Sequence, residues 1–124
     1  VLEGVCYHLR WQLESIEKKF DVIDGIKLVG GGALAPGTCQ LLADIIGRKI
    51  IVVKNPQNAG AVGAVLIAAV GLGIMDNLHD AGKLIEIDYE YIPDMKNNEI
   101  HDKQFKLFKS LYHNNKAAFH ELNN

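Results

Sequence analysis

The sequence has few of the residues that build metal centres or disulfide frameworks. Its 124 residues include two cysteines, five histidines, three prolines and one tryptophan. Cys6 and Cys39 form no CxxC pair, and no two histidines stand four residues apart around a glutamate, so the pattern predicts no zinc site. Each cysteine lies in an apolar helical pattern. We therefore expect two buried, reduced thiols in a cytoplasmic protein, and a disulfide between them is the alternative.

A strong charge of either sign is also missing. The formal net charge is −2, which gives no bulk attraction to nucleic acid or to an anionic membrane surface. Hydrophobic residues make up 48% and charged residues 23%, which is typical of one folded globular domain. Lysines interspersed with acids and apolar residues late in the chain indicate a solvated helix face: Lys96, Lys103, Lys106, Lys109 and Lys116.

No segment has the length and composition of a membrane span. The longest uncharged candidate, residues 59–75, falls short of the about 20 residues that a spanning helix needs and is rich in Gly and Ala. We expect a helix buried inside a soluble protein. No signal-peptide pattern is present. The chain starts at Val1, already in a helical pattern, so we expect a piece of a longer polypeptide.

Hydrophobic periodicity predicts amphipathic helices at both ends of the chain and one near the middle. The first covers residues 1–20, with residues 21–25 as its stop. Pro36 in the first turn and Gly47 after the last predict a second helix over residues 36–47. A terminal helix is expected over residues 100–122. The apolar face of the first helix is Leu2, Val5, Cys6, Leu9, Leu13, Ile16 and Phe20.

Short apolar runs predict the strands. Residues 26–32 read as a strand that ends in a glycine loop, and residues 50–53 as a parallel strand buried on both faces. Residues 84–92 alternate loosely and are expected to be extended or an edge strand. This order predicts an α/β domain over residues 1–124, with parallel strands joined by crossover helices. Two predicted strands are too few for a self-sufficient sheet, so we expect further strands upstream.

A helix rich in small residues is predicted over residues 57–70. Gly60, Ala64 and Ala68 recur every four residues and form one stripe. Such a stripe lets another backbone approach closely.

Three consecutive glycines, Gly30 to Gly32, follow the first predicted strand. Glycines here leave no Cβ between the backbone and a ligand. Their N–H groups and the start of the next helix form a natural anion site, at the strand end where ligands of open parallel sheets lie. The pattern favours nucleotide or phosphate binding, and a purely structural turn is the alternative.

Residues 30–35 also satisfy the G-x-G-x-x-A form of the dinucleotide fingerprint. Two features count against it. Pro36 would fall inside a running Rossmann helix, and the second strand ends in Lys54-Asn55, where a ribose-binding acid would stand. An NADP-binding domain stays as the weaker alternative. No Walker A lysine follows the glycines, which excludes a P-loop.

The segment Val29-Gly30-Gly31-Gly32-Ala33, followed by Pro36 and by Gln40-x-x-Ala43-Asp44-x-x-Gly47, resembles the adenosine-binding segment of FGGY carbohydrate kinases. These belong to the actin–hexokinase superfamily, which implies a partial ribonuclease H-like domain. Residues 59–69 resemble the helix that connects the two lobes, which makes Gly60, Gly63 and Ala64 hinge residues. The chain is most similar to xylulokinase-like members.

The resemblance implies which residues meet ATP. Gly31 and Gly32 would lie against its phosphate–ribose part. Ala33 and Pro36 would border the adenine, with Gly37 and Gln40 nearby. Leu34, Ala35 and Thr38 depart from residues common in the family, which would alter adenine packing.

The resemblance also implies what lies elsewhere. The catalytic aspartate, most sugar contacts and most of the Mg²⁺ site would belong to other parts of the kinase, so no catalytic or metal-binding residue is assigned here. Asp44 falls on the helix side away from the loop and is expected to be solvated or capping. We expect this chain alone to be inactive and to self-associate. A non-catalytic interaction module of the same fold is the alternative.

Overall fold

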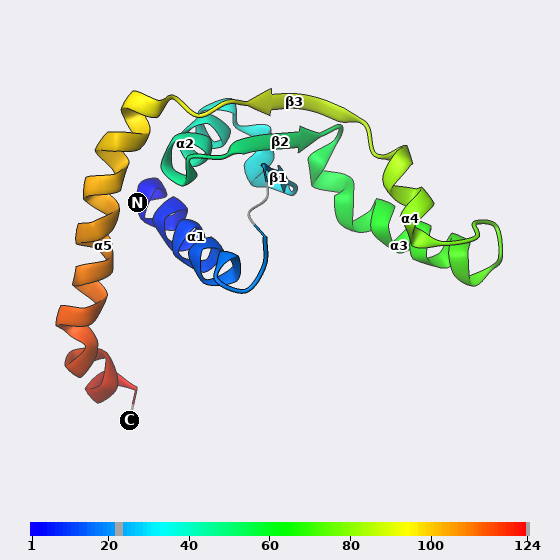
Figure 1. The fold of residues 1–124 in the computed structure, drawn as a ribbon. Helices are drawn as coiled ribbons and strands as arrows, with labels where there is room; N and C mark the ends of the chain where they lie inside the picture. The colour runs from blue at the N-terminus through cyan, green and yellow to red at the C-terminus, as the bar shows by residue number, and fades with distance from the viewer. Residues whose placement is uncertain (22–23, 124) are drawn as a thin grey trace.

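The computed structural model describes residues 1–21 and 24–123 and shows a mixed α/β arrangement around a three-stranded sheet (Figure 1). The strands are β1 (Gly25–Leu28), β2 (Lys49–Val53) and β3 (Ile87–Tyr91), in the spatial order β1-β2-β3. β1 and β2 are parallel, whereas β3 runs antiparallel to β2. The predicted α/β class and parallel pair are confirmed, and the loosely alternating segment is an edge strand.

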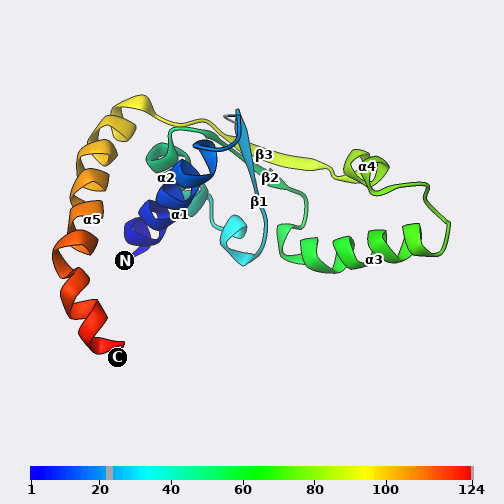
Figure 2. The same cartoon turned by 60° about the horizontal axis from the view of Figure 1, so that its bottom comes forward.

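Five α-helices and three short 3-10 turns surround this sheet in the described part of the chain. They are α1 (Leu2–Glu17), η1 (Gly31–Leu34), α2 (Pro36–Ile46), η2 (Pro56–Asn58), α3 (Ala59–Gly71), α4 (Leu78–Ala81), η3 (Gly82–Leu84) and α5 (Met95–Leu122). In Figures 1 and 2, α5 lies at one end of the sheet, while α3 and α4 extend from the other.

The crossover helix α2 has the ends that its sequence predicts. Pro36 is at its first position, where the missing N–H leaves no hydrogen bond unmade. Gly47 ends it with φ +69, and its N–H donates to the carbonyl of Ala43 at 2.8 Å. A left-handed residue at this place satisfies one of the last carbonyls of the helix.

Three predicted helix boundaries need correction. The first helix ends at Glu17, because the N–H groups of Lys19 and Phe20 both turn back to the Ile16 carbonyl. The predicted stop over residues 21–25 falls partly on residues 22 and 23, outside the described residues. A 3-10 turn takes the first residues of the segment 57–70, so α3 begins at Ala59. The terminal helix begins at Met95 instead of residue 100.

The core lies between α1, α2, the first half of α5 and one face of the sheet. Its largest fully buried side chains are Phe105, Ile45, Ile50, Cys6 and Cys39. Both cysteines are free, buried thiols, as expected from their apolar surroundings in the sequence, and no disulfide joins them. Burial raises the pKa of each thiol, with nearby Glu3 adding to the rise for Cys6.

Phe105 anchors α5 to this core. Its ring lies under the Arg10 guanidinium, 4.4 Å from the ring centroid, and near the Lys109 ammonium at 4.3 Å. Arg10 also donates to the carbonyl of Ile45 at 2.8 Å and forms a 2.6 Å ion pair with Asp102. One arginine on α1 therefore holds both α2 and α5.

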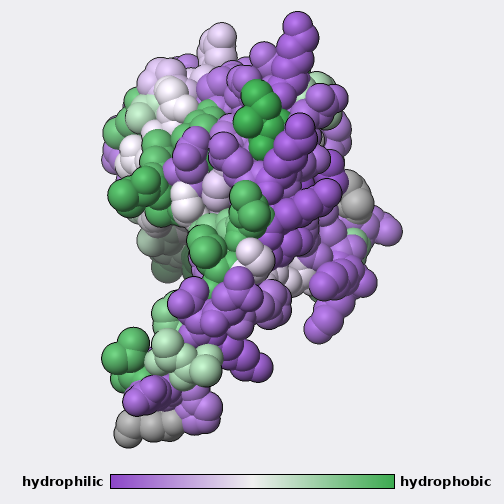
Figure 3. Space-filling model, turned by 90° about the vertical axis from the view of Figure 1, so that its left-hand side faces the viewer, coloured by the Kyte–Doolittle hydropathy of each residue, from purple (hydrophilic) through white to green (hydrophobic). Residues whose placement is uncertain are grey.

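The solvated face predicted for the late lysines is largely confirmed. Figure 3 views the α5 side of the molecule, which is mostly hydrophilic. Lys96, Lys103, Lys106 and Lys116 are exposed. Lys109 differs, because it is half-buried and pairs with Glu14 of α1 at 3.1 Å.

Three apolar surfaces, on α1, β2 and α3, are less covered than the sequence predicts. On α1, Cys6 and Tyr7 are buried, but much of the predicted apolar face is exposed. In β2, Ile50, Val52 and Val53 are buried and Ile51 is half-buried, so the second face of that strand is only partly covered. The expectation of a buried helix over residues 59–75 is wrong for the described chain, because α3 has no buried residue although it carries no charge. Within residues 1–21 and 24–123, no helix is long and apolar enough to cross a membrane.

Candidate functional site

The glycine loop after β1 is held by backbone hydrogen bonds. The N–H of Gly30 donates to the carbonyl of Pro56 at 2.8 Å, which ties the loop to the segment after β2. The N–H of Ala33 donates to the carbonyl of Gly30 at 3.1 Å and closes the 3-10 turn. Gly30 has φ +90 and ψ −178, a conformation that essentially only glycine adopts. This first glycine is therefore required by the turn itself.

The next glycines have a different explanation. Gly31, Gly32 and Gly37 are exposed, and a Cβ added to any of them would meet no atom within 4 Å. Packing within the described chain therefore does not require glycine at these three places. Their bare backbone suits the close approach of a group from outside the chain.

The start of α2 lies directly after this loop. Its N-cap residue, Ala35, supplies no side-chain acceptor for the first N–H groups, and Pro36 at the first position is exposed. The first turn of a helix carries a partial positive charge. Together with the open glycine backbone, this helix start can hold a phosphate or another anion.

Ala33 and Leu34 lie on opposite sides of the 3-10 turn. Ala33 is buried, and its carbonyl accepts from the Cys39 thiol at 3.5 Å. Its side chain thus belongs to the core beneath the loop. Leu34 is 58% exposed and offers an apolar side chain beside the open glycines. Leu34 was noted in the sequence only as a departure from the family pattern.

Gln40 is used inside the fold. Its Nε2 atom donates to Asp44 Oδ1 at 2.8 Å and to the carbonyl of Ile92 at 2.8 Å. The side-chain nitrogen therefore links α2 to the segment between β3 and α5. Gln40 does not bring this nitrogen to the exposed glycines.

The small-residue helix borders a cleft at the carboxyl ends of β1 and β2. Gly60 and Ala64 are exposed and Gly63 is half-buried. A Cβ on Gly60 or Gly63 would meet no atom within 4 Å. The cleft has a volume of about 540 Å³, and its lining includes Lys27, Val29, Asn55, Val62, Gly63 and Leu66.

An exposed ion pair forms one rim of this cleft. Lys54 Nζ lies 2.8 Å from Glu86 Oε2. The pair raises the pKa of Lys54 and lowers that of Glu86, so both groups stay charged at neutral pH. In the NADP-binding alternative Lys54 would have to meet the ribose 2′-phosphate, but here it is paired with Glu86.

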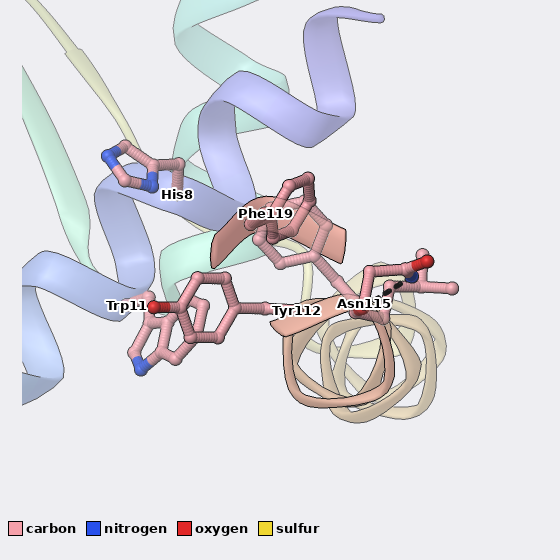
Figure 4. Close-up of a pocket in the computed structure, with 7 residues that line it drawn as sticks. His8, Trp11, Tyr112, Asn115 and Phe119 are labelled. Carbon is pink, nitrogen blue, oxygen red and sulfur yellow. Dashed lines mark hydrogen bonds between the residues drawn. The ribbon is translucent and has the colours of Figure 1, made fainter. Parts of the chain in front are cut away.

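A second hollow, of about 530 Å³, lies between α1 and α5 (Figure 4). Trp11 and Tyr112 meet edge to face with ring centroids 5.5 Å apart, and Phe119 stacks on Tyr112 at 6.1 Å. None of the predicted site residues lines this groove. Its lining includes no lysine or arginine, the side chains that most often hold a phosphate.

Asp44 is buried and fully used in structure. It accepts hydrogen bonds from the Asp94 N–H, Asn97 Nδ2 and Gln40 Nε2 at 2.8–3.0 Å. The expected solvated role is wrong. Asp44 is not a cap either, because the N-cap residue of α5 is Asp94; the bonds of Asp44 instead tie α2 to the start of α5. Among the described residues, no three His, Cys, Asp or Glu side chains gather as a metal site.

Comparison with known protein families shows to which family the chain belongs. Residues 1–72 match the sequence profile of the FGGY family of carbohydrate kinases, C-terminal domain. This match covers more than half of the chain. The chain belongs to the FGGY family of carbohydrate kinases.

FGGY kinases of several organisms resemble this chain over most of its length. A xylulose kinase of Lactococcus lactis is 33% identical over 98% of this chain and 25% of the relative. A glycerol kinase of Saccharolobus islandicus is 31% identical over 77% of this chain and 19% of the relative. The chain therefore spans about a fifth to a quarter of the length of these relatives.

A solved structure of a sugar kinase shares the fold. The ligand-bound xylulose kinase of Lactobacillus acidophilus aligns with a TM-score of 0.86 and 24% identity, over 98% of this chain and 25% of that chain. The arrangement of helices and strands described above therefore also occurs in that xylulose kinase.

Proposed function

We propose that this chain supplies the ATP-binding surface of an FGGY carbohydrate kinase. The observation that carries the proposal is the open backbone at Gly31, Gly32 and Gly37, beside the uncapped start of α2 and beyond the carboxyl ends of the parallel strands. Ligands of open parallel sheets bind at this end, and phosphates favour a helix start lined by glycine amides.

Each residue of the loop then has a distinct task. The backbones of Gly31 and Gly32 contact the phosphate–ribose part of ATP. Pro36 and Gly37 border the adenine, and the exposed side chain of Leu34 adds apolar contact. Ala33 supports the turn from the core side, and Gln40 fixes α2 through Asp44 and the Ile92 carbonyl.

Phosphoryl transfer requires groups beyond this chain. It depends on positioning both substrates and on neutralising charge with Mg²⁺, and Asp44 is engaged in structure. We place the catalytic aspartate, the sugar pocket and most of the Mg²⁺ site in other parts of the kinase. This chain by itself then has no kinase activity, while its residues bind and orient the nucleotide.

A xylulose-like sugar is our preferred substrate, since the Lactococcus lactis relative is a xylulose kinase. The glycerol kinase among the relatives makes a smaller polyol the alternative.

Gly60, Gly63 and Ala64 would let the two lobes of the kinase move relative to each other when ATP binds. Two free, buried thiols fit an enzyme of the reducing cytoplasm.

Isothermal calorimetry on the full-length protein that carries this chain tests the proposal. MgATP binding, with turnover when xylulose is added, is the expected result. Absence of nucleotide binding would favour the non-catalytic module, and a preference for NADP(H) would favour the dinucleotide-binding alternative. Phosphorylation of xylulose by residues 1–124 alone would contradict the placement of the catalytic groups elsewhere.

A further inference from the structure

Asn55 has a backbone conformation that few side chains adopt. Its φ is +50 and its ψ is +56, and in the part of the chain that the structure describes it is the only residue other than glycine with a positive φ. Pro56 follows it, and the residue before a proline ordinarily takes extended backbone. Asparagine tolerates the left-handed region better than most residues do. Such strained positions cluster at functional sites, where the surrounding structure holds them.

The side chain of Asn55 does not explain why asparagine stands here. Asn55 is the N-cap residue of η2, but its side chain makes no capping hydrogen bond, and the residue is exposed. Its contribution to η2 is the backbone carbonyl, which accepts from the Asn58 N–H at 2.9 Å. Every residue type offers a carbonyl. What asparagine adds is therefore access to the left-handed backbone.

The chain is fixed on both sides of Asn55. Before it, the Lys54 N–H donates to the Glu86 carbonyl at 2.9 Å and holds the end of β2 to the segment before β3. After it, Pro56 is buried, and its carbonyl accepts from the Gly30 N–H at 2.8 Å. Asn55 is the corner between these two fixed points. Its left-handed turn sets the direction in which the chain leaves β2, and so aims the Pro56 carbonyl at Gly30.

The Pro56 carbonyl in turn holds the start of the glycine loop. Its donor, Gly30, has φ +90 and is followed directly by Gly31 and Gly32. The short turns η1 and η2 also contact each other. A residue with positive φ therefore stands at or next to each end of this hydrogen bond. The place of the bare backbone at Gly31 and Gly32 depends on where the Pro56 carbonyl lies.

We propose that Asn55 is a positioning residue for the nucleotide, because its left-handed backbone places the Pro56 carbonyl that holds the glycine loop. This inference rests on the proposed function. Asn55 acts through Gly30, and the loop amides after Gly30 then lie where they meet the phosphate–ribose part of ATP. Direct contact between the Asn55 side-chain amide and the nucleotide is the rival explanation.

Two substitutions in the full-length protein that carries this chain separate the backbone of Asn55 from its amide. Asn55→Gly removes the amide but keeps easy access to the left-handed region. Asn55→Val removes the amide and disfavours that region, because valine is β-branched. By calorimetry at a temperature where all proteins are folded, we expect Asn55→Gly to bind MgATP within about twofold of the unsubstituted protein and Asn55→Val about tenfold more weakly.

A milder variant covers the case in which Asn55→Val cannot be recovered folded. Asn55→Ala also disfavours the left-handed region, but its side chain is small and unbranched. We then expect a several-fold loss of MgATP affinity relative to Asn55→Gly. Equal affinity of Asn55→Ala and Asn55→Gly would overturn the inference.

Gly73→Val is the matched control for strain alone. Gly73 has φ +70, and a Cβ added there would meet no atom within 4 Å. It follows α3, at the end of that helix away from the sheet (Figures 1 and 2). We expect Gly73→Val to lower the unfolding temperature as Asn55→Val does and to leave MgATP affinity unchanged. An equal loss of affinity in both would show that general destabilisation is the cause and would overturn the inference.

Hydrogen exchange measures the positioning bond itself. The segment of residues 28–33 contains the Gly30 amide, whose exchange is slowed by its bond to Pro56. We expect this segment to exchange several-fold faster in Asn55→Val and at the ordinary rate in Asn55→Gly and Gly73→Val. Equal exchange of this segment in all of these variants would overturn the inference.

The remaining outcomes separate this inference from its rival and from the proposed function. If Asn55→Gly weakens MgATP binding as much as Asn55→Val does, the side-chain amide contacts the nucleotide directly and the positioning role is wrong. MgATP binding that Asn55→Val leaves unchanged would contradict this inference alone. An unsubstituted protein that does not bind MgATP would contradict the proposed function, and this inference with it.

Discussion

The carboxylate of Asp44 accepts a hydrogen bond from the backbone N–H of Asp94, with 2.8 Å between Oδ1 and N. This bond joins the last part of α2 to the residue that caps α5. Asn97 Nδ2 donates to the other carboxylate oxygen at 3.0 Å, and Asn98 Nδ2 donates to the Asp44 carbonyl at 2.7 Å. One buried acid thus fixes where α5 begins and how it meets α2.

Replacing Asp44 should loosen the start of α5. Asp44→Ala leaves several donors without their acceptor in a buried place, and each such loss costs about 1–3 kcal/mol. Because some of these donors can reach water, we expect the free energy of unfolding to fall by about 3 kcal/mol. Urea unfolding followed by Trp11 fluorescence measures this, since Trp11 packs edge to face on Phe108 of α5.

Asp76 provides the matched control. It is an exposed acid in the turn between α3 and α4, so Asp76→Ala should change the free energy of unfolding by less than about 0.5 kcal/mol. Equal effects of the two substitutions would show that the Asp44 network does not stabilise α5.

The start of α5 is a boundary that the sequence predicted only in part. Periodic aromatic residues predicted the helix only from residue 100, because residues 95–99 are mostly polar. The structure starts it at Met95, since Asp94 accepts from the Lys96 N–H as an N-cap. The Pro93-Asp94 pair was an available signal for this boundary. Its pairing with Asp44 was not, because it joins residues fifty positions apart.

The exposure of the apolar face of α1 was misjudged for a different reason. Apolar periodicity correctly predicted a helix and its apolar side, but whether other residues cover that side depends on tertiary packing, which periodicity does not give. Tertiary packing also limits what the sequence predicts about the candidate site. Sequence alone located the glycine loop, whereas the engagement of Gln40 with Asp44 and the inward side chain of Ala33 depend on tertiary packing.

Substitutions in the glycine loop should separate folding from nucleotide binding. Gly30→Ala forces a side chain into a left-handed conformation and should reduce the free energy of unfolding by about 1–3 kcal/mol. Gly31→Ala and Gly32→Ala have room for the new methyl group and should leave stability nearly unchanged. In the full-length protein, we expect these two to weaken MgATP binding about tenfold, which corresponds to about 1.4 kcal/mol.

Calorimetry together with thermal unfolding of all three variants checks this difference. Unchanged MgATP affinity for both Gly31→Ala and Gly32→Ala would remove these glycines from the proposed site. A loss of stability in these two variants would show that the loop backbone packs against protein.

Arg10→Lys should be destabilising although it keeps the charge. Arg10 holds the Ile45 carbonyl, the Asp102 carboxylate and the Phe105 ring at once. A lysine ammonium cannot reproduce this planar, forked contact. We expect a loss of about 1–2 kcal/mol in urea unfolding, in line with a lost hydrogen bond from a charged group. Lys106→Arg on the exposed side of α5 is the control, and an equal effect there would contradict the role of Arg10.

The two thiols should be unreactive in the folded chain. Burial raises the pKa of Cys6 and Cys39, and only the thiolate attacks disulfide reagents. We expect slow labelling by Ellman's reagent at pH 8 in buffer and complete labelling in concentrated urea. Fast labelling of either thiol in buffer would contradict their burial.

The raised pKa values also fix the sign of a pH effect. In the unfolded chain a thiol ionises near its ordinary pKa of about 8.5, whereas the folded thiols stay protonated to higher pH. Their contribution to stability is therefore complete below about pH 8.5 and falls as the pH rises toward the folded pKa. Urea unfolding at pH 7 and pH 9.5 measures the fall. The Cys6→Ala, Cys39→Ala double variant separates it from the tyrosines and lysines that titrate in the same range, and an unchanged pH dependence in that variant would show that the thiols are not its cause.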